Sequence, residues 1–393
     1  MRYFKRFVIL FACTWWLCPQ VVISQTVSDS AKQKRSFWNP IRKLGRLIDT
    51  LSVSGIDRRY IDIPEKPWQV MVKGNINQTI LTMKSTINGR DLFQLAKGDL
   101  VWEPEIKTNP SIYAGVWVGY RGYGLGYSWN VGGDKGRILT LGATGGSYGV
   151  NLRIHSFEKK HTEVHMAGNF YNFEEPPQLE YVDDTEPLYL SSPIKIRTLF
   201  LDAYYLFNGK HFSYCAAYDQ SVIQKRSAGS LVAGVMYYYS RVKYDKDENA
   251  GFIMLMNDVG RVKQWQMSAG LGYAYNYVPF KGMLVSIICM PMLTFYNRYK
   301  MWNYDSNLRH LARFDQDMKD SELDDAYKLT LVSVNSLHTR ISPNIDARLS
   351  LTYQWDRFFV NAYGQFITFH YKTHQVSGNT NDWYVNTTLG VRF

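Results

Sequence analysis

A serine, a histidine and an asparagine lie close together in the last third of the chain, and these residue types can form a hydrolytic site. Ser336 and His338 are separated by one residue, and Asn335 comes directly before them. A hydroxyl beside an imidazole base could hydrolyse a lipid or a peptide, but such a triad is defined by geometry and not by sequence adjacency. No Gly-x-Ser-x-Gly elbow stands between an expected strand and an expected helix. We therefore assign no catalytic residue, and an enzyme stays an alternative that the pattern does not favour.

A second group of residues could supply metal ligands. His155, His161 and His165 lie close to Glu158 and Glu163, and a hairpin could bring two of the histidines together. Their spacing matches no zinc motif, and the two lysines between them are typical of an exposed segment. We therefore expect no metal site, and the absence of a cofactor fingerprint predicts no cofactor.

The third group consists of five polar residues in the middle of the chain: Asp202, Asp219, Gln224, Lys225 and Arg226. If the two cations fold inward, they could pair with Asp202 or Asp219 and hold a loop in place, because buried charges need partners. The same cations could instead bind an anion or a phosphate. We predict a polar network in the interior that stiffens the protein, with the anion site as the alternative.

The segments that would position these residues alternate between apolar and polar side chains. Trp265 to Tyr277 has apolar residues at every second position, with small or polar residues between them. Ile345 to Trp355 does the same and places a carboxylate and a guanidinium on its polar face. The last segment, Trp383 to Phe393, begins and ends on an aromatic residue. Such a period of two is that of a β-strand with one apolar face.

The polar face of these strands indicates where the apolar face points. A soluble sandwich would bury the apolar face against a second sheet. A membrane barrel turns it outward to lipid and keeps polar and charged groups inside, with aromatic residues at both interfaces. We therefore predict an all-β protein, a transmembrane antiparallel up-and-down β-barrel of about 12 strands, within a range of 10 to 14. The five-residue polar network would then lie in the lumen.

Thirteen segments carry the strand pattern. Because a single-chain bacterial barrel has an even number of strands, we expect one of these segments not to be a barrel strand. They are 68–75, 78–86, 111–119, 122–131, 137–144, 147–157, 194–207, 228–243, 264–278, 283–300, 344–355, 357–371 and 383–393. Residues 75–77 and 279–282 are predicted as tight turns on the periplasmic side. Three longer polar links, 174–186, 244–249 and 305–325, are predicted as surface loops.

The amino-terminal residues indicate export. Arg2, Lys5 and Arg6 precede an apolar run, and small residues end at position 24, which predicts a cleavable signal peptide over residues 1–24. Residues 25–60 are predicted as a periplasmic segment with a short amphipathic helix between residues 36 and 51. Residues 61–393 would form the barrel. We therefore expect the protein in a bacterial outer membrane.

Composition agrees with a barrel and narrows the function classes. The chain holds 29 Tyr, 11 Trp and 29 Gly with 20% charged residues, which suits aromatic girdles and closely packed strands. The formal charge of +11 includes three basic residues of the predicted signal peptide, which leaves 11 − 3 = +8. This excess is compatible with an anion-favouring lumen, with contacts to acidic lipid headgroups, or with a scattered surface excess. The basic residues do not gather into a patch with interleaved aromatics, so we expect no nucleic acid partner. Cys215 and Cys289 are predicted as unpaired, buried thiols.

The middle of the chain resembles a known family. The segments that carry the likeness are 201–214, 216–221 and 224–230, with support from 112–120 and 125–128. They are similar to the signature of a Bacteroidetes family catalogued as domain of unknown function 4421, and the likeness extends from Asp57 to Phe393. Cys215 departs from that pattern, since a proline is expected there. The resemblance implies an outer-membrane barrel and brings no substrate, reaction or catalytic residue.

A barrel of this kind is compatible with three functions, and whether side chains fill its lumen distinguishes the first two. One is a narrow pore for small solutes, including anionic ones; another is a filled barrel with a structural or surface-interaction role; the third is a rim-located hydrolase. Inward Gly and Ser would leave space, whereas four large aromatic residues would obstruct the lumen if they share one level of the barrel: Tyr113, Trp117, Tyr204 and Tyr384. The expected partners of a monomer are outer-membrane lipid and the barrel-assembly machinery, which would bind the carboxy-terminal strand ending in Phe393.

Overall fold

A computed structural model describes the chain from Trp38 to Phe393 with several internal gaps. The described residues are 38–88, 99–107, 110–133, 135–171, 178–246, 248–255, 258–306, 328–338, 341–372 and 376–393. The predicted signal peptide at residues 1–24 lies outside them. None of the described helices is both long enough and apolar enough to cross a membrane.

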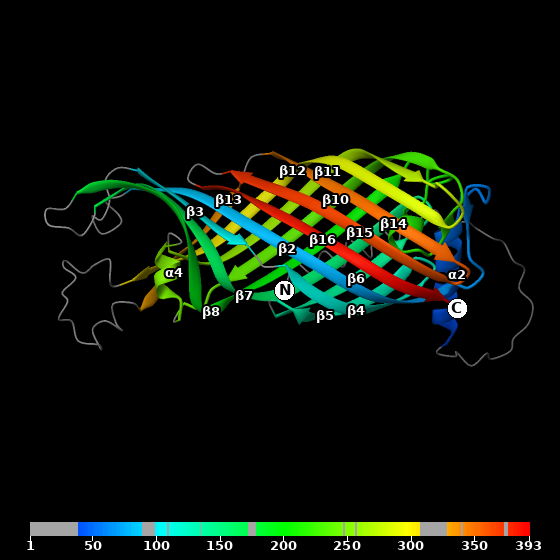
Figure 1. Ribbon diagram of the computed structural model, residues 1–393, viewed down its shortest axis with the longest axis horizontal. Helices are drawn as coiled ribbons and strands as arrows, with labels where there is room; N and C mark the ends of the chain where they lie inside the picture. The colour runs from blue at the N-terminus through cyan, green and yellow to red at the C-terminus, as the bar shows by residue number, and fades with distance from the viewer. Residues whose placement is uncertain are drawn as a thin grey trace, which may run out of the picture. The chain divides into compact units, whose positions relative to one another are not determined.

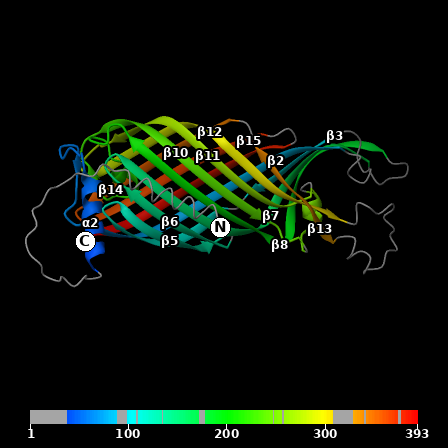
Figure 2. The same cartoon turned by 180° about the vertical axis from the view of Figure 1, so that it is seen from behind.

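The described residues form a closed antiparallel β-barrel (Figures 1 and 2). Its sheet has 14 strands, and β3 (Asp99–Lys107) and β13 (Leu329–His338) lie outside the ring, which leaves twelve. The ring strands are β2 (Trp68–Asn88), β4 (Ser111–Tyr120), β5 (Tyr123–Gly132), β6 (Gly136–Thr144), β7 (Tyr148–Tyr171), β8 (Leu179–Leu206), β10 (Ala228–Lys243), β11 (Val259–Tyr277), β12 (Met283–Ser306), β14 (Ser342–Trp355), β15 (Phe358–Lys372) and β16 (Val376–Arg392). β16 pairs with β2 and closes the ring. The predicted fold class and strand number are confirmed.

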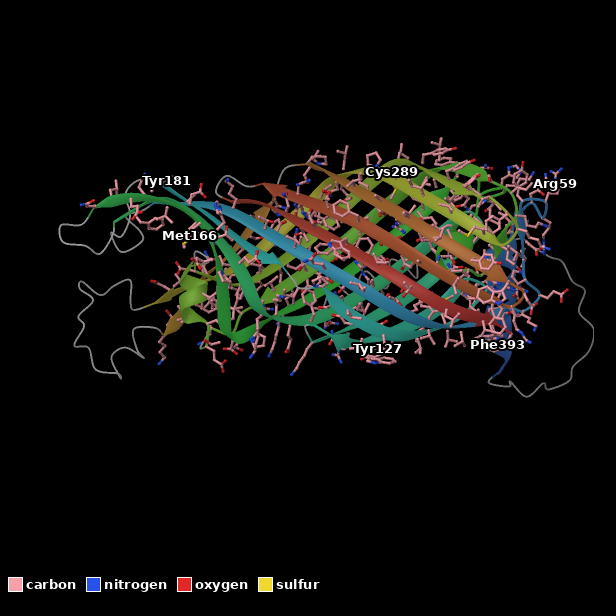
Figure 3. The ribbon with its side chains drawn as sticks, in the orientation of Figure 1. Arg59, Tyr127, Met166, Tyr181, Cys289 and Phe393 are labelled. Atoms are coloured by element: carbon pink, nitrogen blue, oxygen red, sulfur yellow. The ribbon has the colours of Figure 1, made fainter. Side chains whose placement is uncertain are left out.

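Side chains alternate between the two faces of the wall, apart from a few register shifts. On β14, Asn344, Asp346 and Arg348 are buried in the lumen, whereas Leu349 and Leu351 are exposed on the outer face. Figure 3 shows Tyr127 and Cys289 on the outer face. An apolar outer wall and a polar inner wall are the arrangement expected of a barrel in lipid. Cys215 is a buried free thiol as predicted, but the prediction of a buried Cys289 was wrong because its strand position points outward.

The two ends of the barrel differ in their connections. At the end that holds Trp68 and Phe393, β4–β5 and β14–β15 are joined by two-residue turns. Arg121, Gly122 and Asp356 adopt positive φ angles of 52°, 87° and 50° there. Such angles match the right-handed twist of the flanking strands in a tight hairpin. We call this end the short-turn end.

At the opposite end, several strands continue far beyond their neighbours. β7 has 24 residues and β8 has 28, whereas β4, β5 and β6 have 10, 10 and 9. β3 pairs with the parts of β2 and β7 that extend beyond the short strands β4, β5 and β6. It therefore connects β2 to β7 where those three strands have ended. β13 pairs with the far part of β12. These paired extensions stand out in Figure 1 on the side away from the C-terminus.

Three predicted boundaries were wrong. β2 runs without a break from Trp68 to Asn88, so the predicted turn at residues 75–77 does not exist and two predicted segments are one strand. Cross-strand pairing with β16 continues through these residues and overrides their local turn propensity. β8 begins at Leu179, so part of the predicted loop 174–186 is strand. The link 244–249 is not an exposed loop, because Tyr244 and Asn249 are buried.

The helix α2 (Trp38–Val53) covers the segment predicted to be amphipathic and helical. Its residues from 46 onward contact the short-turn end of the barrel. Asp49 Oδ1 accepts a hydrogen bond from the Tyr120 hydroxyl at 2.9 Å and lies 3.6 Å from Arg121 Nε. These contacts fix the second half of α2 beside the β4–β5 turn.

Candidate functional site in the barrel lumen

The connection between β8 and β10 folds into the barrel instead of forming a short turn. We call residues 207–227 the inner loop. It contains α3 (Tyr214–Tyr218), whose five residues are all buried, and β9 (Ile223–Gln224). Ser213 begins the helix as its N-cap, since its hydroxyl accepts a hydrogen bond from the Ala216 N–H at 3.2 Å. The family signature of the sequence therefore corresponds to a segment that fills the lumen.

Side chains of the barrel wall bind the carbonyl groups at the end of α3. Ala217 O accepts hydrogen bonds from Ser350 Oγ at 2.6 Å and Asn361 Nδ2 at 3.0 Å. Gln220 O accepts two from the Arg392 guanidinium, at 2.6 and 3.0 Å. The last carbonyls of a helix have no partner within the helix, and here the wall supplies them. Strands β14, β15 and β16 thus hold the inner loop in one position.

Gln224 joins the two halves of the inner loop. Its Oε1 accepts hydrogen bonds from the Ser213 N–H at 3.0 Å and from Asn276 Nδ2 on β11 at 3.1 Å. Its Nε2 donates to His211 O at 2.7 Å and to Arg226 O at 2.8 Å. Both ends of this buried amide are therefore satisfied, as burial of a polar group requires.

The segment before β2 is tied to the same loop. β1 (Ile61–Asp62) pairs with β9, and the Asp57 N–H donates to Lys210 O at 3.0 Å. Hydrogen bonds from the Arg59 guanidinium hold the pKa of Asp57 well below its usual range. His211 Nε2 lies 3.4 Å from the same carboxylate. Residues 57–62 therefore fasten the outer side of the inner loop.

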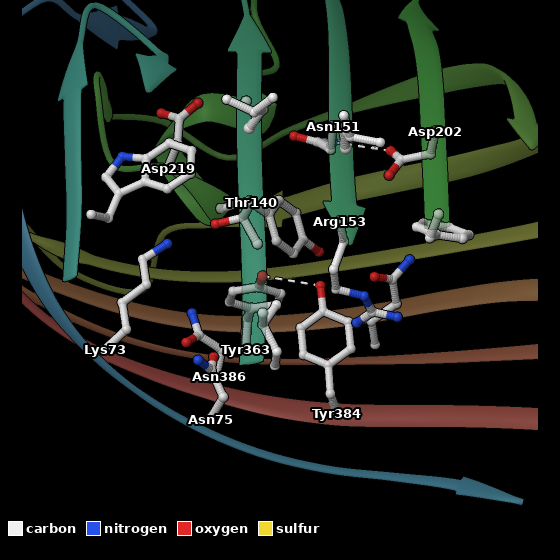
Figure 4. A pocket seen from close by; sticks show the side chains of 18 of the residues that line it. Lys73, Asn75, Thr140, Asn151, Arg153, Asp202, Asp219, Tyr363, Tyr384 and Asn386 are labelled. Carbon is white, nitrogen blue, oxygen red and sulfur yellow. Dashed lines mark hydrogen bonds between the residues drawn. The ribbon is translucent and has the colours of Figure 1, made fainter. Parts of the chain in front are cut away.

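A buried charge cluster occupies the lumen beside α3. Arg348 Nη2 lies 2.6 Å from Asp346 Oδ2 and 3.2 Å from Asp202 Oδ2, and its Nη1 donates to the Tyr214 hydroxyl at 2.7 Å. The Asp346 side chain is 0% exposed and that of Arg348 is 6% exposed. Asn151 Nδ2 donates to Asp202 at 3.0 Å (Figure 4). The cluster links β7, β8 and β14 to the inner loop through Tyr214.

A second ion pair lies further along the lumen. Arg153 Nη2 forms a salt bridge with Asp382, and Thr79 Oγ1 donates to the same carboxylate at 3.1 Å. The Arg153 guanidinium also lies 4.2 Å from the ring centre of Tyr384. The Tyr384 hydroxyl is 3.0 Å from that of Tyr363, and this contact crosses the view in Figure 4. These side chains tie β7, β15 and β16 together inside the barrel.

Asp219 and Lys73 face each other across the remaining space. Asp219 accepts hydrogen bonds from the Thr144 hydroxyl and, at 2.8 Å, from the Ser221 N–H. Burial in the inner loop raises the pKa of Asp219. Lys73 Nζ lies 4.3 Å from the ring centre of Trp117, and Figure 4 shows its side chain reaching toward Asp219. The cavity is therefore lined by charges of both signs.

The free space among these side chains is small. The lumen cavity lined by Lys73, Arg153, Asp202 and Asp219 has a volume of about 100 Å³. Ligand pockets typically have volumes of ~300 to 1,000 Å³. A space of this size holds a few water molecules, so the chemistry that the arrangement supports is charge pairing and hydrogen bonding within the wall.

A second, apolar cluster lies against the lumen side of β7, β8 and β10 at the end with the long extensions. The helix α4 (Ala250–Leu255) contributes to it from the connection between β10 and β11. Its buried members are Phe157, Leu190, Ile194, Ile196, Val242, Tyr244, Ala250, Phe252, Ile253 and Leu329. These side chains come from β7, β8, β10, β13 and the β10–β11 connection, so they narrow the lumen on this side.

The structure divides the five predicted network residues into two groups. Asp202 and Gln224 are buried in the lumen and Asp219 is partly buried there, and each has the hydrogen-bond partners given above. Lys225 and Arg226 are exposed at the short-turn end. The backbone N–H of Lys225 donates to Tyr60 O at 2.7 Å, and the Arg226 guanidinium lies 5.8 Å from the Tyr60 ring centre. They do not pair with the two aspartates.

Sequence reasoning missed the residue that does pair with Asp202. Arg348 supplies this charge from β14, and Asp346 completes the cluster. The sequence did indicate that β14 contributes charges to the interior, because the alternation of this strand places one guanidinium and one carboxylate on its polar face. Nothing in the pattern of β14 pointed to Asp202, since the two strands lie far apart in the chain and meet only across the lumen.

The other candidate residues are dispersed. Ser336 Oγ accepts a hydrogen bond from Arg298 Nε at 2.9 Å, and no hydrogen bond within the described residues joins it to His338. His155 is buried in the lumen, with Nε2 2.8 Å from the Tyr113 hydroxyl. His165 is partly exposed on the long β7–β8 hairpin, 2.8 Å from Asp183 Oδ1. His155 and His165 thus lie in different surroundings on β7.

These features define a closed twelve-stranded β-barrel with a polar, packed lumen. The family model described as "Domain of unknown function (DUF4421)" matches residues 56–393, and the chain belongs to this family. The predicted resemblance to domain of unknown function 4421 is thereby confirmed, and the Bacteroidetes origin stays a prediction. No curated protein matches the chain.

Solved structures of other barrels show only a distant likeness. The outer membrane protease OmpT from Escherichia coli is 5% identical, with 84% of this chain and 98% of that chain covered and a TM-score of 0.33. The β domain of the Bordetella autotransporter BrkA is 10% identical, with 82% and 100% covered and a TM-score of 0.25. The toluene transporter TodX from Pseudomonas putida is 6% identical, with 84% and 91% covered and a TM-score of 0.24. At these scores, none of the three bears on what this chain does.

Proposed function

We propose that the protein is an outer-membrane barrel with a closed lumen, which anchors long strand extensions at the cell surface for a structural or surface-interaction role. The observation that carries the proposal is the filling of the lumen at two levels. The inner loop closes it at the short-turn end, and the apolar cluster around α4 occupies part of it at the other end. A conducting pore would need a continuous water path, and the cavity between these levels has a volume of about 100 Å³.

The outer wall supports the membrane part of the proposal. Large apolar side chains such as Val116, Leu271 and Leu351 are exposed there, at 44%, 69% and 47%. Contiguous exposed apolar surface of this kind needs a lipid or protein cover. The leader predicted at residues 1–24 would deliver the chain to the periplasm, and short turns of bacterial barrels face that side. The long extensions would then project from the cell.

The lengths of the strands support a role for the extensions. A transmembrane strand needs ~9 to 11 residues to cross the hydrocarbon region. β8 has 28 residues, and its far part carries the exposed acidic side chains of Glu180, Asp183, Asp184 and Glu186. This part of β8 pairs with β7 on one side and has no partner from β10, whose pairing begins at Lys195. An acidic strand edge outside the membrane is a surface on which another molecule can bind.

The test combines two measurements: the ionic conductance of the protein in a planar bilayer, and the access of a water-soluble thiol reagent to the lumen. The folded protein is inserted into planar bilayers, and insertion is verified by its heat-dependent migration in gels. We expect no steady current at either polarity. Two single-cysteine variants, Thr140→Cys and Asp356→Cys, are made in a background without native cysteines. Position 140 lines the lumen cavity, and position 356 lies in the exposed β14–β15 turn.

A bulky, water-soluble maleimide should modify the Asp356→Cys variant rapidly and the Thr140→Cys variant only after unfolding. Asp356→Cys is the matched control, because it reports that the reagent is active and the protein accessible. A steady current from the native chain, or equal labelling of the two variants, would refute the closed lumen and favour the narrow pore. Removal of the far part of the β7–β8 hairpin should leave the absence of current unchanged.

A further inference from the structure

The outer wall carries a dense group of cations at the boundary between its apolar band and the extensions. We call this group the basic belt, and it consists of Arg137, Lys195, Arg197, Arg241, Lys243, Arg261, Lys263 and Lys300. Its members come from β6, β8, β10, β11 and β12. All of them occupy outward-facing positions, since the residues next to them in each strand face the lumen.

Four of these cations form one row across four neighbouring strands. Arg197 pairs in register with Arg241, Arg241 with Lys263, and Lys263 with Lys300. Side chains opposite each other on one face have Cβ atoms ~4.5 to 5.5 Å apart, and like charges at such positions destabilise a sheet. The row therefore costs folding free energy unless something outside the chain compensates its charge.

The chain itself supplies little compensation. Glu158 is the register partner of Lys195, but no carboxylate of the described residues lies within ion-pair distance of any belt cation. Trp302 provides an aromatic face, with Arg261, Lys300 and Lys263 at 4.4, 5.2 and 5.3 Å from its ring centre. Arg261 Nε is buried and has no hydrogen-bond partner. Donors thus remain available for an anion.

The surface beside the row is apolar and aromatic. Two residues along each strand toward the short-turn end, Leu199 pairs with Tyr239, and Tyr239 pairs with Trp265. The Tyr239 and Trp265 rings lie 5.6 Å apart. On the side of β6, the belt borders a groove of about 650 Å³ that Tyr127, Trp129 and five belt cations line together. A ligand that fits this surface has anionic groups joined to a large apolar part.

We infer that the basic belt binds the phosphate groups of membrane lipids in the outer leaflet, with the acyl chains lying against the adjacent apolar wall. A phosphate offers several acceptor oxygens and can neutralise two neighbouring cations at once. A free phosphate would leave the apolar border without a ligand. The inference rests on the proposed membrane embedding, and it does not depend on whether the lumen is closed.

The experiment compares a row variant with a control variant of equal charge. The row variant carries Arg197→Gln, Arg241→Gln, Lys263→Gln and Lys300→Gln. The control variant carries four Gln substitutions at exposed cations of the short-turn end: Lys66→Gln, Lys210→Gln, Lys281→Gln and Arg357→Gln. Each protein, folded in a neutral detergent, is titrated with diphosphoryl lipid A, with its monophosphoryl form and with inorganic phosphate. Bound lipid is counted by native mass spectrometry, and the unfolding temperature is measured.

Diphosphoryl lipid should bind the native chain most tightly and raise its unfolding temperature, and the monophosphoryl form should do both less. The row variant should lose about fivefold in affinity for each cation removed. Without lipid, the row variant should unfold at the same temperature as the native chain or higher, because like-charge repulsion has been removed. A purely structural role for these residues predicts the opposite shift.

Equal lipid affinity of the row and control variants would overturn the inference. So would equal stabilisation by inorganic phosphate, since the site would then bind an adventitious ion only. Failure of the membrane embedding has a different signature: the chain would remain monomeric in solution without any detergent. A steady current through the native protein would contradict the closed lumen and would leave the lipid result valid.

Discussion

Removal of Arg348 tests whether the buried charge cluster holds the lumen together. We consider Arg348→Met, because methionine fills much of the same volume without a charge. The substitution leaves Asp346 and Asp202 in the lumen without their cation, at side-chain exposures of 0% and 7%. It also removes the donor to the Tyr214 hydroxyl, which anchors the inner loop.

The expected cost follows from the burial of the two carboxylates. Breaking a buried ion pair by removing one partner typically costs about 3 to 5 kcal/mol. Gln365 Nε2 still donates to Asp346 at 2.9 Å, and Asn151 Nδ2 still donates to Asp202 at 3.0 Å. These remaining hydrogen bonds favour the lower half of the range, so we expect a loss of about 3 to 4 kcal/mol in the free energy of unfolding.

The assay is equilibrium unfolding in detergent with guanidinium chloride, followed by tryptophan fluorescence and by gel migration of unheated samples. A triple variant, Asp202→Asn, Asp346→Asn and Arg348→Met, replaces the whole cluster by neutral groups. It should recover most of the loss, because a neutral replacement of a buried ion cluster leaves no uncompensated charge. Arg197→Met, an outward cation with no carboxylate partner, is the matched control and should change stability by less than about 1 kcal/mol.

A cost below about 1 kcal/mol for Arg348→Met would refute the reasoning, because surface ion pairs contribute that little. The lumen at this level would then be open to water. A triple variant as unstable as Arg348→Met alone would also contradict the account. In that case, shape and not charge compensation would be what the cluster provides.

Three further outcomes follow from the same structure. Burial raises the pKa of Asp219 above its unfolded value of 3.8. The Asp219 carboxyl group therefore stabilises the folded state fully below pH 3.8. This stabilisation is lost as the pH rises through the raised pKa. Asp219→Asn should therefore flatten the fall in unfolding temperature between acid and neutral pH, and an unchanged pH profile would contradict this. The buried thiol of Cys215 should resist a water-soluble maleimide until the inner loop unfolds. The thiol of Cys289, on the outer wall, should react with a lipid-soluble maleimide in the folded protein. Rapid labelling of Cys215 would show that the loop opens. Deletion of Phe393 removes two backbone hydrogen bonds to Trp68, at 2.9 and 3.2 Å, and should lower the yield of folded barrel in cells, while Phe280→Ser at an exposed turn should not.

The local pattern of the chain was sufficient for the class of fold. A period of two with an apolar face depends only on residues within one strand, so β11, β14 and β16 could be assigned from the sequence, and their two faces point as predicted. The same pattern indicated a charged lumen on β14. Strand ends were less certain, because β2 and β8 continue through polar residues that only cross-strand pairing keeps extended.

The filling of the barrel depends on contacts between distant parts of the chain. The sequence showed that Asp202, Asp219 and Gln224 stand in one polar segment, and the fold places all three inside. It could not show that Arg348, far along the chain, meets Asp202 across the lumen at 3.2 Å. Nor could it show that Lys225 and Arg226 face away, because their direction depends on the path of the inner loop.

The sequence by itself therefore determined the barrel and its polar interior, since these follow from residue types repeated along single strands. It also indicated the family, through the signature segments around the inner loop. Only the tertiary structure decided that the inner loop folds into the lumen, which charges neutralise one another and where the cations of the outer wall gather. The basic belt is the clearest case: its members come from five strands spread over residues 137–300, and only the register between those strands brings like charges side by side.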